Sequence, residues 1–233
     1  HDLNQEVEGL ALSMPGAVDS EVGVIKGSSA LDYIHGPNIK EDLQARLNLK
    51  VTLENDANCA ALAEVWKGAA SDVDDCMFIV SGTGIGGAVV KNRLIHRGKH
   101  LHGGEFGYMV ALNDIENDEY ISWSEAGSTV AVVKAVAKEL EVEPETLDGK
   151  EIFDHASENP VYQKYVNQYF SVLAVGIYNL QYVYDPEKIV IGGAISARDD
   201  LLEQLEKHLD KIYTKIPHAK IRPQVVKCKF ANQ

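Results

Sequence analysis

The chain has 233 residues, of which 45% are hydrophobic and 24% are charged, so it can form a globular protein with a full core. Its formal net charge of −13 argues against nucleic acids and anionic membranes as partners, because both favour a basic surface. No apolar run reaches the length of a membrane span.

The first half of the chain alternates apolar runs with helical segments. Its predicted elements are a buried strand over residues 9–14, a short hairpin arm over 22–25, a helix opening at Pro37, a strand over 50–53 and an alanine-rich helix over 57–66. A strand over 76–80 and a second hairpin arm over 86–90 follow. Residues 95–104 predict a loop that is rich in glycine and histidine.

The second half is dominated by helices. Its predicted elements are a helix over residues 124–140, a short helix opened by a capping box at 148–151, a long apolar helix over 160–184, a strand over 188–191, an amphipathic helix over 198–213 and a strand over 225–230. Trp66 and Trp123 are expected in the core or in the wall of a cleft. The rhythm of strands, hairpins and helices predicts an α/β fold.

Asn55 and Asp56 lie where a predicted strand meets a predicted helix. Open α/β sheets place their ligands at the carboxyl ends of strands, so a carboxylate here is a candidate general base for a hydroxyl group. A structural interpretation stays open, in which Asp56 caps the helix and Asn55 is a turn residue.

The stretch from Ser81 to Gly87 has four glycines and follows a predicted strand. Such a turn lets the backbone approach a phosphate group closely. It continues into a second strand and not a helix, so neither the P-loop nor the dinucleotide fingerprint fits, and an ordinary hairpin is the alternative. A carboxylate at one strand end and a phosphate cradle at the next favour phosphoryl transfer.

Cysteine and histidine patterns do not predict a metal site. The three cysteines, Cys59, Cys76 and Cys228, lack the spacing of metal ligands, which favours reduced thiols in a cytoplasmic protein. His96, His100 and His102 do not form a standard tetrahedral pattern.

Five stretches, in order, resemble the ROK family of sugar kinases and sugar-responsive repressors. They are residues 12–19 with Pro15–Gly16, residues 54–58, residues 81–87, residues 103–108 and residues 185–194. The resemblance covers nearly the whole chain and implies the actin-like ATPase (ribonuclease H-like) fold, with two lobes.

The resemblance also implies an incomplete N-terminal lobe. The family's opening Asp-x-Gly-Gly-Thr phosphate hairpin is expected before Gly9 and is absent, as is the helix that usually follows the last strand. We expect residues 1–90 to hold the remainder of the small lobe and the start of the large lobe. Residues 91–233 are expected to form the large C-terminal lobe with the adenosine-side turn.

Carried over by residue, the resemblance implies an ATP-dependent sugar kinase that uses ATP and Mg²⁺. Asp56 is the expected catalytic base for a sugar hydroxyl, that of C6. The expected sugar-binding residues are Pro15, Gly16, Asn55, Asp56, Glu105 and Tyr108. The expected nucleotide-binding residues are Gly82, Thr83, Gly84, Gly192 and Gly193.

The chain departs from the family pattern near the sugar. Tyr108 stands where the family has a signature histidine, the zinc-binding cysteines are absent, and Ser124 stands where a glutamate is usual, with Glu125 adjacent. No structural zinc is therefore expected. These changes predict space for a substituent at the anomeric end, as in a β-glucoside or disaccharide. The alternative is that Tyr108 fills the space left by zinc and touches no sugar.

Two other functions compete with the kinase. One is a sugar-responsive repressor of the same family, which requires a helix-turn-helix before the sugar domain, and the other is a catalytically inactive sugar-binding protein. The resemblance implies a sugar and ATP as small-molecule partners and a homodimer.

Overall fold

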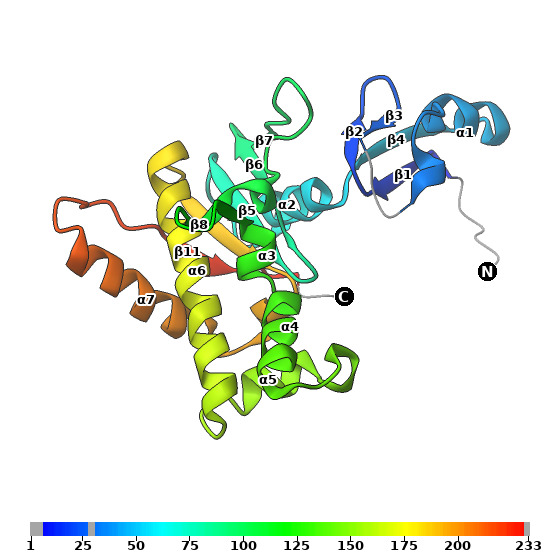
Figure 1. Ribbon diagram of the computed structural model, residues 1–233. Helices are drawn as coiled ribbons and strands as arrows, with labels where there is room; N and C mark the ends of the chain where they lie inside the picture. Colours follow the sequence, from blue (N-terminus) through cyan, green and yellow to red (C-terminus); the bar gives the residue numbers. More distant parts are fainter. Residues whose placement is uncertain (1–6, 28–30, 231–233) are drawn as a thin grey trace.

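Figure 1 shows the computed structural model of the protein, which describes residues 7–27 and 31–230. A smaller part holds strands β1 to β4 and helix α1, and a larger part holds a five-stranded sheet covered by helices. This mixture of strands and helices confirms the predicted α/β class. The expected division at residues 90 and 91 falls at the end of strand β6 and stays a prediction.

Two strand pairs build the smaller part. Strand β1 (Gly9–Met14) pairs in parallel with β4 (Lys50–Asn55), and β2 (Ala17–Asp19) forms a hairpin with β3 (Val24–Lys26). Its buried side chains are Val18, Ile25, Ile34 and Leu53. The register places Met14 opposite Asn55, so the chain leaves both parallel strands at the same edge.

Two predictions for the smaller part need correction. Strand β1 is not fully buried but alternates between exposed and half-buried residues, because in the described part of the chain only one of its faces meets the core. Helix α1 (Ile39–Leu47) begins two residues after Pro37. Asn38 caps it, since the Asn38 side chain accepts the Glu41 N–H.

The sheet of the larger part has the strand order β11-β10-β5-β6-β7. Its strands are β5 (Cys76–Ser81), β6 (Ile85–Lys91), β7 (Leu94–Ile95), β10 (Lys188–Gly192) and β11 (Val225–Lys227). Strands β5, β10 and β11 are parallel, β6 runs antiparallel to β5, and β7 runs antiparallel to β6. Gly192 lies opposite Val80, so the turns after β5 and β10 leave the sheet at one edge.

Helices cover both faces of this sheet, because β5 is apolar on both sides. Met77 and Ile79 pack into the core formed with α3, α4, α5, α6 and α7. Cys76 and Phe78 face α2 on the other side. The helices are α2 (Asp56–Lys67), α3 (Trp123–Gly127), α4 (Thr129–Leu140), α5 (Gly149–Asp154), α6 (Pro160–Tyr184) and α7 (Leu201–Lys215).

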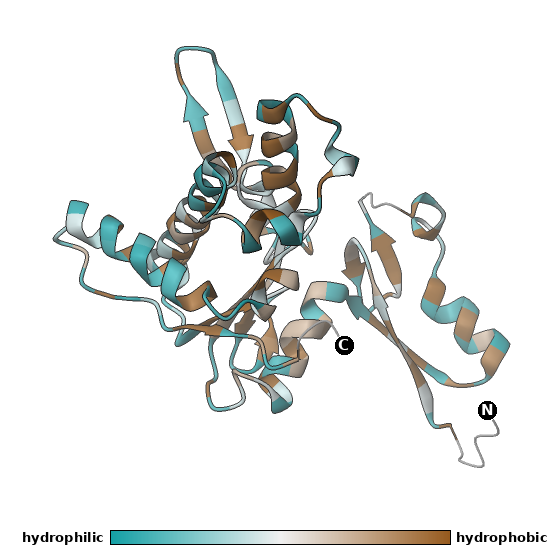
Figure 2. Cartoon of the chain, turned by 90° about the horizontal axis from the view of Figure 1, so that it is seen from below, coloured by the Kyte–Doolittle hydropathy of each residue, from teal (hydrophilic) through white to brown (hydrophobic). Residues whose placement is uncertain are grey.

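Figure 2 shows hydrophobic and hydrophilic residues alternating along the outer helices, as expected for helices with one face against a core. In α7 the buried stripe includes Leu201, Leu205 and Leu209, while Leu202 is 38% exposed. Helix α6 has the predicted bounds. Within residues 7–27 and 31–230, no helix is both long enough and apolar enough to cross a membrane.

Three further predictions are wrong in detail. The helix expected over 124–140 is two helices, because Ser128 has an extended backbone and caps α4 by accepting the Ala131 N–H. Asp148 caps α5 through the Lys150 N–H and forms no capping box with Glu151. Trp123 is buried as expected, but Trp66 is 72% exposed near the end of α2.

The acidic segment around residue 115 joins two short strands that the sequence did not indicate. Strands β8 (Val110–Asp114) and β9 (Glu119–Ser122) form an antiparallel hairpin before α3. The described residues also form the short 3₁₀ helices η1 (Asp32–Ile34), η2 (Phe106–Tyr108), η3 (Pro144–Thr146) and η4 (Ala194–Ala197).

Candidate active site

Asn55 connects the end of β4 to two other segments. Its side-chain Nδ2 donates a hydrogen bond to the Gly16 carbonyl at 3.1 Å, and its Oδ1 accepts the Asn58 N–H at 3.1 Å. Asn55 is therefore the N-cap of α2, and Asp56 is the first residue of that helix. The structural alternative placed the cap at Asp56 and a turn residue at Asn55, so it is wrong in that detail.

Asp56 presents an exposed carboxylate at the N-terminus of α2. Its Oδ1 accepts the Ala57 N–H at 2.8 Å, and in the described part of the chain the carboxylate forms no ion pair. The geometry therefore leaves an exposed carboxylate that is able to accept a proton from a bound hydroxyl group.

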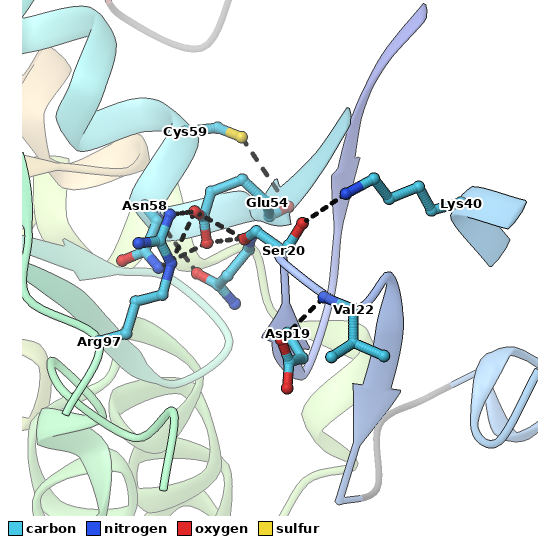
Figure 3. Close-up of polar contacts among 9 residues, drawn as sticks. Asp19, Ser20, Val22, Lys40, Glu54, Asn58, Cys59 and Arg97 are labelled. Atoms are coloured by element: carbon cyan, nitrogen blue, oxygen red, sulfur yellow. Dashed lines mark hydrogen bonds and ion pairs between the residues drawn. The ribbon is translucent and has the colours of Figure 1, made fainter. Parts of the chain in front are cut away.

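Glu54, next to Asn55, is the centre of a polar network that links several segments (Figure 3). It accepts hydrogen bonds from Ser20 in the turn after β2, from Asn58 in α2 and from Arg97 in the loop after β7. Burial raises the pKa of the Glu54 carboxyl, but the bonds from Asn58, Arg97 and the Asn55 N–H outweigh it. The pKa therefore lies below its ordinary value of 4.5.

The glycine turn between β5 and β6 is a hairpin held by Ser124. The Ser124 hydroxyl accepts the Ile85 N–H at 2.9 Å and donates to the Ile85 carbonyl at 3.3 Å. A Cβ added to Gly82 would meet no atom within 4 Å, so there is open space above the turn. The adjacent Glu125 accepts hydrogen bonds from Ser122 in a capping box, which gives Glu125 a structural role in α3.

The two turns expected to bind the nucleotide are packed against their neighbours. The Gly82 carbonyl accepts both the N–H (3.1 Å) and the hydroxyl (2.8 Å) of Thr129 at the start of α4. Gly193 has a φ of +87°, and a Cβ there would lie 2.3 Å from the Ser81 carbonyl oxygen. Packing alone therefore requires glycine at position 193, whatever else it binds.

A cavity of about 760 Å³ lies beside both turns. Thr129 connects its wall to Gly82, and Ala194 follows Gly193 directly. An ion pair between Arg198 and Asp154 is part of the lining. The lining residues are Thr129, Asp148, Gly149, Lys150, Phe153, Asp154, Ala194, Ile195, Ala197, Arg198, Asp199 and Asp200. Cavities of this size hold drug-sized molecules.

Glu105 precedes the 3₁₀ helix η2 and Tyr108 is its last residue; this helix packs on strand β6. A Cβ on Gly104 would lie 2.7 Å from the Gly87 carbonyl oxygen, so the chain before Glu105 runs very close to β6. Glu105 is half-buried, and in the described residues its carboxylate forms no ion pair. Tyr108 is 78% exposed and does not fill an interior space.

Potential metal ligands are dispersed. Within the residues that the structure describes, no three or more histidine, cysteine, aspartate or glutamate side chains are placed together to hold a metal ion. The absence of a structural zinc stays a prediction. Cys76 is buried, and burial raises the pKa of its thiol to about 11, which keeps the thiol protonated at neutral pH.

The sequence model of the ROK family matches residues 1–233. The chain belongs to the ROK family. It is 35% identical over 208 residues to a beta-glucoside kinase of Listeria innocua, covering 88% of this chain and 71% of that protein. It is 34% identical over 204 residues to a beta-glucoside kinase of Klebsiella pneumoniae, covering 87% and 69%.

A solved ROK structure has the same fold. The crystal structure of a ROK family protein from Streptococcus pneumoniae in complex with sucrose superposes with a TM-score of 0.89 at 36% identity, covering 98% of this chain and 77% of that one. This similarity confirms the resemblance read from the five sequence stretches. The chain has the actin-like ATPase fold of the ROK sugar kinases.

Among the contacts described above, one joins two predicted site residues directly, the hydrogen bond from Asn55 to Gly16. The others run through residues that were not predicted: Glu54 binds Arg97 ahead of Glu105, and Ser124 lies between the glycine hairpin and Gly107 of η2. Sequence reasoning gave no role to Glu54 and did not mention Arg97. Glu54 lies inside the stretch that was singled out, but its partner is 43 residues away, and no local pattern reports such a pairing.

Proposed function

We propose that this ROK chain is an ATP-dependent kinase that transfers the γ-phosphoryl group of ATP to a sugar hydroxyl, that of C6 in a glucose-type or β-glucoside substrate. The observation that carries the proposal is the Asp56 carboxylate. It is exposed at the N-terminus of α2 and is adjacent to Asn55, which holds the Pro15–Gly16 turn. The similarity of the chain to beta-glucoside kinases supports the same proposal.

Asp56 would accept the proton of the attacking hydroxyl, and its main contribution is position, because the proton can move late in phosphoryl transfer. Asn55 keeps one Nδ2 hydrogen free after donating to Gly16, which it can offer to a sugar oxygen. Glu105 would accept hydrogen bonds from sugar hydroxyls. Pro15 and Gly16 would form the opposite side of the sugar site.

The nucleotide would lie along the edge where β5 and β10 end. The open space above Gly82 fits a phosphate group, with Thr83 and Gly84 completing the turn. The cavity beside Gly192 and Gly193 fits an adenosine group. Mg²⁺ bound with ATP would neutralise charge on the phosphates.

The sugar end of the site supports a substrate with a substituent at the anomeric carbon. Tyr108 is exposed at the end of η2, the Ser124 hydroxyl is hydrogen-bonded to Ile85, and the Glu125 carboxylate is hydrogen-bonded to Ser122, so none of them closes that end of the site. The sucrose complex of the Streptococcus pneumoniae protein agrees with this proposal, because its sugar is a disaccharide.

The test is ADP formation from ATP and Mg²⁺ by the complete gene product with glucose, fructose, N-acetylmannosamine, cellobiose and an aryl β-glucoside. Turnover of the β-linked sugars supports both the kinase and its specificity. Turnover of glucose alone keeps the kinase and contradicts the specificity. Sugar binding without turnover contradicts the kinase and favours a binding protein or repressor.

The role of Tyr108 is tested by Tyr108→Ala, with Tyr120→Ala as the matched control, because Tyr120 is also exposed, at 64%, on the neighbouring strand β9. A sugar contact predicts that only Tyr108→Ala changes the ratio of kcat/KM between cellobiose and glucose. The cytoplasmic location and the homodimer remain part of the proposal, and light scattering of the complete protein tests the dimer.

A further inference from the structure

We propose that Glu54 and Arg97 are positioning residues that fix the loop carrying Glu105 relative to the strand end carrying Asp56. The inference rests on the proposed roles of Asp56 and Glu105 in sugar phosphorylation. It adds to that function a pair of residues that touch neither the sugar nor the nucleotide. Their effect on the reaction is exerted through the residues beside them.

Both oxygens of the Glu54 carboxylate accept hydrogen bonds, and the donors come from four segments of the chain. Oε1 accepts the Asn55 N–H at 2.9 Å and the Asn58 Nδ2 at 3.0 Å. Oε2 accepts the Ser20 hydroxyl at 3.0 Å, the Arg97 Nε at 3.0 Å and the Arg97 Nη2. With its side chain 12% exposed, Glu54 is held on all sides (Figure 3).

These bonds act directly on the residues around Asp56. Asn55, which precedes Asp56, donates its N–H to Glu54, and Asn58 in the first turn of α2 donates its side-chain amide. The first turn of α2 is thus anchored to Glu54 on both sides of Asp56. A shift of the Glu54 carboxylate must therefore move or loosen the backbone that presents the Asp56 carboxylate.

Arg97 transfers the same constraint to Glu105. The Arg97 carbonyl accepts the Gly103 N–H at 2.9 Å, which closes the loop on itself two residues before Glu105. A Cβ on Gly103 would lie 2.2 Å from the His96 carbonyl oxygen, so the backbone at Gly103 packs directly against the backbone at His96. The Arg97 side chain therefore sets where the rigid base of this loop lies relative to β4.

An ordinary structural ion pair is the competing explanation, and it predicts a different result. A structural pair affects folding stability alone, whereas a positioning pair alters the alignment of Asp56 and Glu105 while the protein stays folded. The nucleotide turns are held by residues outside this network: Gly82 is bonded to Thr129, and Gly193 packs against Ser81. A positioning role therefore predicts a defect for the sugar and for catalysis, and none for ATP binding.

The test compares Glu54→Gln, Arg97→Gln and the double variant in the complete gene product. The matched control is Glu139→Gln, which breaks the ion pair between Glu139 and Lys164 on α4 and α6. For each single variant we expect kcat to fall about tenfold and the sugar KM to rise about tenfold, with the ATP KM unchanged. The double variant should be no worse than the poorer single variant, because the two residues act as one unit.

Hydrogen exchange provides a second measurement that does not depend on turnover. Arg97→Gln should speed exchange in the segment 55–58 as well as in its own loop, and Glu139→Gln should change neither. Normal kcat and sugar KM in both single variants would overturn the proposal, as would faster exchange confined to the loop of Arg97. A wild-type protein without sugar turnover contradicts the kinase, and the exchange experiment still decides the role of the pair.

Discussion

The side-chain amide of Asn55 donates a hydrogen bond of 3.1 Å to the backbone carbonyl of Gly16, joining the ends of two parallel strands. The register of β1 and β4 makes this bond possible, because Met14 lies directly opposite Asn55. The Pro15–Gly16 turn and the first turn of α2 therefore form one rigid edge. Four of the predicted sugar-binding residues belong to it: Pro15, Gly16, Asn55 and Asp56.

Asn55→Ala tests this edge against simple loss of a helix cap. Removing an N-cap costs about 1 kcal/mol of stability, and Asn38→Ala is the matched control because Asn38 caps α1 in the same way. Both variants should lower the free energy of unfolding by similar amounts in urea titrations. Only Asn55→Ala should also lower kcat/KM for the sugar, and equal activity in the two variants would contradict a role for Asn55 in the site.

Gly193→Ala tests the close approach of the turn after β10 to β5. The variant combines a positive φ, which costs about 1–2 kcal/mol with a side chain, with a contact of 2.3 Å to the Ser81 carbonyl oxygen. Gly36→Ala is the control, because Gly36 has a φ of +100° and open space around it. Thermal unfolding should show a larger loss for Gly193→Ala, and a loss equal to that of Gly36→Ala would show that the contact is unimportant.

Substitution of Glu64, which lies outside the candidate site, should strongly lower the stability of the fold. It is 2% exposed, and its carboxylate accepts the backbone N–H groups of Ala69, Lys229 and Phe230. Glu64→Ala removes the acceptor of all three N–H groups, and because a hydrogen bond to a charged group contributes about 1.5–3 kcal/mol, a loss of several kcal/mol is expected. Glu64→Gln, which keeps one oxygen, should lose less.

The control for Glu64 is Glu158→Ala, at a surface ion pair with His155 whose side chains are 71% and 56% exposed. Such a pair contributes about 1 kcal/mol or less. Chemical denaturation of the variants measures the difference. A Glu64→Ala protein as stable as Glu158→Ala would show that the segment after β11 is held by other contacts.

The lowered pKa of Glu54 predicts a dependence of stability on acid. A carboxyl whose pKa is lower in the folded chain stabilises the fold fully above its unfolded pKa, and this stabilisation is lost as the pH falls through the folded value. For Glu54 the loss should begin near its ordinary value of 4.5 and continue below it. Unfolding of wild type and Glu54→Gln between pH 3 and pH 7 measures it, and parallel curves would contradict the prediction.

The elements that could be predicted from the sequence are those whose ends carry local signals. Helix α6 begins at Pro160 after an asparagine cap and ends before Asp185–Pro186, so both of its ends carry local signals. The Asn55–Asp56 junction was found for the same reason. The break at Ser128 was missed, although Gly127 and Thr129 are weak helix formers and Ser128 is a typical N-cap residue.

Contacts between distant residues could not be read from the chain. Ser124 was considered only as a replacement for a sugar-binding glutamate, yet its hydroxyl holds Ile85, 39 residues away. Trp66 lies on an alanine-rich helix whose buried positions are Asn58, Ala61, Glu64 and Val65, and the next position faces solvent. Composition does not show which face of such a short helix meets the sheet.

The role of Asp56 is tested most directly by sugar phosphorylation with Asp56→Asn in the complete gene product, with calorimetric sugar binding measured alongside. Asp42→Asn is the control, since Asp42 is likewise an exposed acid in the first turn of a helix. We expect kcat to fall about 10²–10⁴-fold for Asp56→Asn, with sugar affinity and melting temperature nearly unchanged. Turnover equal to that of wild type and of Asp42→Asn would contradict Asp56 as the catalytic base.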